Sequence, residues 1–195
     1  MIYPIVAYGD PVLRKKTKEI SADFPNLSAL IENMWETMYE SSGVGLAAPQ
    51  IGNSIRLFIV DSNQILDNLK DKENSDWKDD KGVKEVFINA KILKKEGEEW
   101  LYNEGCLSIP KIREDVSRPD EVHIQYFDAD FKQHTKTFDG LSGRIIQHEY
   151  DHIEGVLFID HLKPLKRRLL KRKLEEISQG KVVVDYKMRF PKTGK

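Results

Sequence analysis

The chain has 195 residues, of which 39% are hydrophobic and 32% charged, and its formal net charge at pH 7 is −1. This length and composition predict one folded domain over residues 1–195 and exclude a disordered chain, because enough apolar surface is available for a core. The balanced charge argues against DNA binding, and the absence of an apolar run of about 18 residues argues against a membrane span.

The N-terminal half is predicted to contain one helix and one buried strand. Apolar residues recur at three- and four-residue spacing over residues 23–39, which is typical of a helix, and Pro25 suits its first turn. A glycine-punctuated segment, GVGLAAPQIG at 43–52, separates this helix from an apolar strand at 56–60. Residues 62–84 are dense in Asp, Lys and Asn, and we expect a long exposed loop there.

The second half is predicted to begin with strands and end with helices. Strands are expected at 85–93 and 99–107, followed by a hairpin over 122–138. A helix follows Asp139 and Gly140, and a very basic helix is expected at 164–178. This order predicts an α+β fold, with a mostly antiparallel sheet, a central helix packed on it, an N-terminal helix and a C-terminal helix.

The central helix carries the pattern H-E-x-x-H. Positions four apart share a helix face, so His148 and His152 could bind one metal ion, with Glu149 beside them. Leu141 and Ile145 lie on the same face, which therefore points into the domain. The pattern also fits a pair of hydrogen-bonded core histidines, because buried imidazoles need partners of some kind.

A catalytic metal site usually needs a third protein ligand. The extended zinc-protease motif would place a histidine where this chain has Phe158, so that motif fails. His161 and the glutamates at 175–176 are the downstream candidates. Upstream lies Cys106, the only cysteine, whose thiolate would be a strong ligand but which could equally be an inert core residue.

Three segments together resemble the signature motifs of the peptide deformylase family. They are GVGLAAPQ at 43–50, EGCLS at 104–108 and QHEYDH at 147–152, in the family's order. The resemblance extends to YGDPVLRK near the N-terminus and to EGVLFIDHLKPLKRR after the third motif. It implies hydrolysis of the N-formyl group on the initiator methionine of new polypeptides, with release of formate. It also implies that Cys106, His148 and His152 bind the metal, with Fe²⁺ favoured and Zn²⁺ able to replace it.

The resemblance assigns catalytic roles that agree with residue chemistry. Glu149 would take a proton from a metal-bound water and return it to the leaving amine. The Gln50 side-chain amide and the Leu107 backbone N–H would stabilise the oxyanion.

The substrate pocket is expected to include Val44, Gly45, Arg113 and Ile145, and the ring of Tyr150 is a further candidate. Gly43 and Gly45 could adopt positive φ and let a peptide backbone approach closely.

Two other functions fit parts of the sequence. An H-E-x-x-H zinc endopeptidase would need a ligand downstream of His152, and a binding module with a structural metal would need a fourth ligand such as His161.

The basic helix is either an ordinary solvated surface or a contact with ribosomal RNA. Its basic residues, counted from the preceding lysine, are Lys163, Lys166, Arg167, Arg168, Lys171, Arg172 and Lys173. One cysteine and no secretory signal favour a cytoplasmic location.

Overall fold

A computed structural model describes residues 1–70 and 80–191 and confirms the α+β fold. Five strands form one antiparallel sheet in the order β2-β3-β4-β5-β6. They are β2 (Gly45–Ala47), β3 (Leu57–Asp61), β4 (Lys84–Cys106), β5 (Ile109–Phe127) and β6 (Gln133–Phe138). A separate parallel pair joins the ends of the chain through β1 (Ile5–Val6) and β7 (Met188–Arg189).

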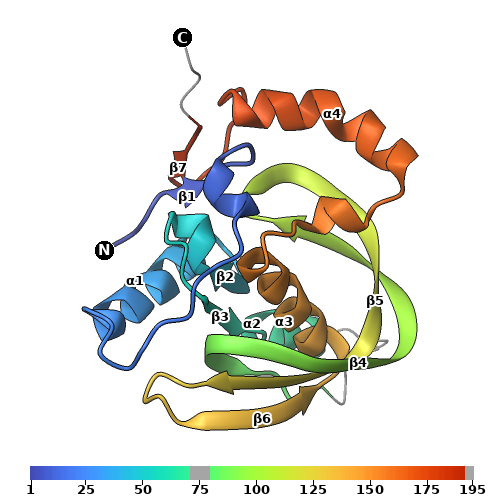
Figure 1. Ribbon diagram of the computed structural model, residues 1–195. Helices are drawn as coiled ribbons and strands as arrows, with labels where there is room; N and C mark the ends of the chain where they lie inside the picture. Colours follow the sequence, from blue (N-terminus) through green and yellow to red (C-terminus); the bar gives the residue numbers. More distant parts are fainter. Residues whose placement is uncertain (71–79, 192–195) are drawn as a thin grey trace.

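The two longest strands curve around the central helix α3 (Gly140–Ile153) (Figure 1). The sequence predicts two strands, at 85–93 and 99–107, whereas the structure has the single strand β4. Its pairing with β5 shifts register at four places, one of them between Glu96 and Glu99. Such bulges bend a strand without ending it, so the polar, Gly97-containing stretch interrupts the apolar pattern but not the strand.

The helix α3 is buried on nearly all sides, because the sheet covers it and the N- and C-terminal segments close around it. Phe58, Phe87 and Tyr126 of the sheet pack against Leu141 and Ile146 of the helix. Burial of this set holds α3 at a fixed place against β2, β3 and β5. The residues that carry H-E-x-x-H are therefore mounted on a rigid element.

The helix α1 (Leu27–Glu40) covers the other side of β2 and β3, with Met34 and Met38 fully buried. It starts later than expected. Asn26 has a left-handed backbone conformation, with φ 56°, so Pro25 lies outside the helix rather than in its first turn. The C-terminal helix α4 (Pro164–Ser178) lies on the outside of the molecule (Figure 1) and buries Leu170 and Leu174.

The expected loop at 62–84 is wrong in its first part, where the structure has the helix α2 (Asn63–Lys70). Leu66 is fully buried in the core beneath it, and Ile65 packs on the same cluster. A few apolar side chains thus anchor a segment whose composition is mostly polar. The part of the expected loop at 71–79 lies outside the described residues.

Candidate active site

Three potential metal ligands meet where β4 ends against α3. Cys106 is the last residue of β4, and His148 and His152 lie one turn apart on α3. One ligand atom from each lies within 4.8 Å of the other two. The Cys106 Sγ is 3.3 Å from the His152 Nε2. This is the set of residues that the sequence motifs single out.

The chemical state of these side chains fits a divalent metal ion. His148 donates its Nδ1–H to Glu104 across 2.9 Å, which leaves its Nε2 lone pair available as a ligand. Burial opposes ionisation of Cys106, but His152 and His148 lower the pKa of the thiol to about 5. A thiolate with two imidazoles suits zinc and ferrous iron alike.

Glu149 lies beside the ligands with an unusual environment for a carboxylate. Its side chain is 4% exposed, and its Oε2 has no hydrogen-bond partner among the described residues. Burial raises the pKa of Glu149 to about 7, although His148 and His152 act in the opposite direction. This carboxyl group can therefore exchange a proton near neutral pH.

The glycines of the first motif are needed for space rather than for backbone conformation. A Cβ on Gly45 would lie 2.5 Å from the Oε1 of Glu149, and one on Gly43 would lie 2.9 Å from Leu107. Neither glycine has positive φ, so that expectation is wrong. Gly45 instead leaves room for the carboxylate of Glu149.

The side chain of Gln50 is oriented by a hydrogen bond from the backbone N–H of Ala47. It lies on a short 3₁₀ helix, Ala48–Ile51, and its Oε1 accepts the Ala47 N–H at 2.8 Å. Its Nε2 consequently faces Cys106 Sγ at 3.5 Å and Ser108 Oγ at 3.4 Å. The amide thus presents donors to the metal-ligand cluster.

A cavity of about 390 Å³ opens beside these residues. The four predicted pocket residues Val44, Gly45, Arg113 and Ile145 all line it, together with Gln50, Leu107, Cys106, His148 and Glu149. Tyr150 does not; its hydroxyl is 3.1 Å from the guanidinium of Arg56. Residues not predicted for the pocket also line the cavity: Ile65, Tyr102, Lys111, Ile112, Leu141 and Tyr186.

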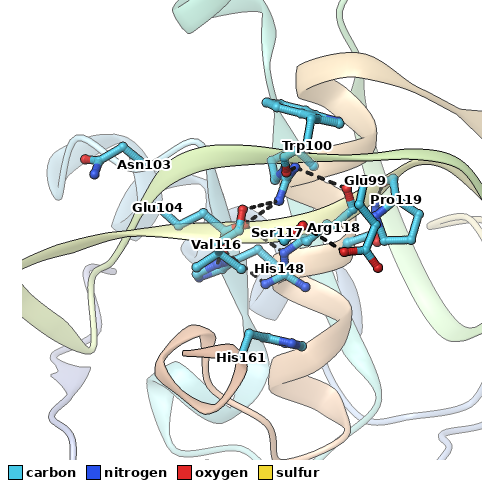
Figure 2. Close-up of polar contacts among 12 residues, drawn as sticks. Glu99, Trp100, Asn103, Glu104, Val116, Ser117, Arg118, Pro119, His148 and His161 are labelled. Carbon is cyan, nitrogen blue, oxygen red and sulfur yellow. Dashed lines mark hydrogen bonds and ion pairs between the residues drawn. The ribbon is translucent and has the colours of Figure 1, made fainter. Parts of the chain in front are cut away.

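A buried charge network lies behind the ligands and centres on Glu104. Arg118 of β5 donates Nε and Nη2 to the two oxygens of Glu104, at 2.7 and 3.0 Å, and Nη1 to Asp151 at 2.7 Å. In Figure 2 the side chains of Glu104, Arg118 and His148 point toward one another. Burial raises the pKa of Glu104, but the bonds from His148 and Arg118 outweigh this and hold it far below its usual range.

The downstream candidates for a third ligand are engaged elsewhere. The Nε2 of His161 is 2.7 Å from Asp151, so His161 closes the charge network instead of joining the ligand cluster. Glu175 and Glu176 pair with Lys171 and Arg172 on α4. The cluster of Cys106 with the two histidines does not include any of these three residues.

Comparison with known proteins identifies the family. The sequence model for polypeptide deformylase matches residues 2–168. The chain belongs to the polypeptide deformylase family. It is 53% identical to a peptide deformylase of Christiangramia forsetii, over all of this chain and 99% of the relative. It is 56% identical to a peptide deformylase of Flavobacterium johnsoniae, over 97% of this chain and 96% of the relative.

The fold comparison agrees with this assignment. A crystal structure of a peptide deformylase from Legionella pneumophila matches with a TM-score of 0.75 and 36% identity, covering 93% of this chain and 98% of the other. Polypeptide deformylases are metal-dependent hydrolases that act on newly made polypeptides, and this chain is an enzyme of that family. Membership favours deformylation over the endopeptidase and binding-module alternatives.

Proposed function

We propose that the chain removes the N-formyl group from the initiator methionine of new polypeptides by hydrolysis of a linear amide, at one metal ion held by Cys106, His148 and His152. The convergence of these three ligand atoms beside a buried, unpartnered Glu149 carboxylate carries the proposal. The metal is ferrous iron, as the family resemblance favours, with zinc as a substitute. When bound, the ion would act as a Lewis acid and lower the pKa of a nearby water molecule.

Glu149 acts as the general base and then as the general acid. Its carboxylate adjoins both ligand histidines on α3 and lines the cavity. The buried Oε2 atom of Glu149 has no hydrogen-bond partner among the described residues. It can therefore accept a proton from the attacking water and pass it to the leaving amine. The carbonyl oxygen becomes negatively charged during attack, and the Gln50 Nε2–H and Leu107 N–H donate to it.

The peptide binds in an extended form along β2. This strand is at the edge of the five-stranded sheet, so an extended backbone can pair with it. The methionine side chain enters the apolar part of the cavity. That part is lined by Val44, Ile65, Tyr102, Leu141 and Ile145. Arg113, which also lines the cavity, contacts the bound peptide further along.

The direct test is formate release from formyl-Met-Ala-Ser by protein prepared without oxygen in the presence of Fe²⁺. We expect turnover by the parent, and loss of both metal and turnover in Cys106→Ala, because two imidazoles hold a divalent ion less tightly than two imidazoles and a thiolate. Metal analysis of both proteins accompanies the assay. A Cys106→Ala protein that keeps its metal and its rate would place the third ligand elsewhere.

We further propose a cytoplasmic location and a contact between α4 and the ribosome. No helix in the described ranges combines the length and apolarity needed to cross a membrane. All six basic residues of α4 are exposed, Arg167, Arg168 and Lys173 among them. Formylated chains emerge from the ribosome, whose RNA offers phosphates to such a surface.

Changing Arg167, Arg168 and Lys173 to glutamate is expected to weaken ribosome binding by about tenfold or more at moderate salt. Turnover of formyl-Met-Ala-Ser should stay unchanged, because α4 does not line the cavity. Co-sedimentation with ribosomes at two salt concentrations measures the effect. The control carries the same charge changes at the exposed residues Lys18, Lys91 and Lys132, distant in sequence from α4. Equal binding by both variants would exclude α4 as the contact.

A further inference from the structure

The C-terminal segment returns to the active site after α4. The strand β7 pairs in parallel with β1, with hydrogen bonds from Ile5 N to Lys187 O at 2.8 Å and from Ala7 N to Arg189 O at 2.9 Å. Figure 1 shows these two strands side by side next to the N-terminus. Arg189 also lies against Gly52, where a Cβ would be 2.6 Å from its guanidinium. The segment is therefore tied to the body of the protein at several points.

Tyr186, two residues before β7, reaches from this segment into the active-site cavity. It lines the cavity together with Cys106 and Leu107, and its hydroxyl donates to the Leu107 carbonyl at 2.8 Å. Its ring packs on the core cluster beneath α1, which holds the side chain in place. The family model matches only residues 2–168, so this residue lies beyond the matched part.

The hydrogen bond from the Tyr186 hydroxyl is made to the turn that carries the proposed oxyanion donor, the Leu107 N–H. Leu107 and Ser108 form the two-residue connection between β4 and β5. The Ser108 carbonyl accepts the Tyr8 N–H at 2.8 Å, and Tyr186 holds the Leu107 carbonyl. Both carbonyls of the turn are thus held by residues that flank the β1–β7 pair.

We propose that Tyr186 is a positioning residue for deformylation: its hydroxyl fixes the Leu107 carbonyl and thereby orients the Leu107–Ser108 turn for the reaction. The inference rests on the proposed function, because it concerns the donor at Leu107. The N–H of Leu107 lies on this turn, directly after the ligand Cys106 at the end of β4, so a rotation of the turn would misplace the donor. A hydrogen bond from outside the turn resists that rotation.

Tyr186→Phe keeps the ring and removes only the hydroxyl. Since the donor acts mainly on the charge that develops during attack, we expect kcat to fall about two- to tenfold while KM stays within about twofold. Metal content should equal that of the parent. Tyr3→Phe is the matched control, because the hydroxyl of Tyr3 bonds to Asn33 at 3.4 Å and lies outside the active-site cavity.

Steady-state kinetics on formyl-Met-Ala-Ser, metal analysis and thermal unfolding are measured for the parent and both variants. A lower kcat in Tyr186→Phe alone, at equal metal content and Tm, supports the inference. An unchanged kcat, or an equal loss of kcat in Tyr3→Phe, overturns it. An inactive parent would instead overturn the proposed function, whereas an active parent beside an equally active Tyr186→Phe would overturn only the role of Tyr186.

Discussion

Replacing Glu149 with glutamine is expected to lower kcat/KM for formyl-Met-Ala-Ser by about 10²- to 10⁴-fold, the usual contribution of a general base. The substitution keeps the shape of the side chain and removes its ability to accept a proton. It should leave the fold intact, because the Oε2 of Glu149 has no hydrogen-bond partner in the described chain that the amide would lose. Metal should also be retained, since Cys106, His148 and His152 are unchanged.

The experiment compares the metal content and turnover of Glu149→Gln with those of Glu98→Gln. Glu98 is an exposed residue of β4, so the control makes the same chemical change away from the cavity. Glu149→Asp adds a second comparison, because it keeps the carboxylate but withdraws it from its position beside Gly45. If the Glu149→Gln protein kept its full metal content and a rate within about threefold of the parent, the loss would be too small for removal of a general base, and Glu149 would not have that role.

The sequence predicts the two histidines and Glu149 as one group because their pattern is local. Helix geometry alone puts His148 and His152 on one face with Glu149 beside them, whatever the rest of the fold does. Cys106 is different, since residue chemistry alone also allows His161 and the two glutamates at 175–176 as the third ligand. Only the combination of three motifs favoured the upstream cysteine, and the structure brings that cysteine to the histidines.

Other parts of the site depend on long-range contacts that no local pattern encodes. Arg118 meets Glu104 because β4 and β5 pair in one particular register, and bulges that the sequence did not reveal set that register. Tyr186 meets Leu107 because β7 pairs with β1, at the opposite end of the chain. Ile65 is a different case: α2 is amphipathic but has only eight residues, and the polar composition of residues 62–84 as a whole predicts a loop there.

Replacing Arg118 with leucine is expected to destabilise the fold by about 3–5 kcal/mol, because it leaves buried carboxylates without their main partner. Arg118 is 2% exposed and serves both oxygens of Glu104 as well as Asp151. In the variant, Glu104 keeps two partners, Arg144 at 3.2 Å and His148, and Asp151 keeps His161. These contacts offset part of the lost stability. For a chain of this size the expected fall in Tm is on the order of 10 °C.

The same substitution should weaken metal binding, because Glu104 orients the ring of His148 through its Nδ1–H. Loss of support behind a metal ligand typically costs about 10- to 100-fold in affinity or activity. Arg118→Lys tests the geometry separately, since lysine keeps the charge but cannot donate to both carboxylates in the planar arrangement of a guanidinium. It should recover part of the stability and less of the metal affinity.

Thermal unfolding and metal titration of both variants are compared with those of Arg14→Leu. Arg14 also pairs with an acid, Asp160, but its side chain is 43% exposed, so its loss should cost about 1 kcal/mol or less. If Arg118→Leu lowered Tm no more than this control, the buried network would not stabilise the fold. If it lowered Tm as expected but bound metal as tightly as the parent, Glu104 would hold His148 without help from Arg118, and the network would serve the fold alone.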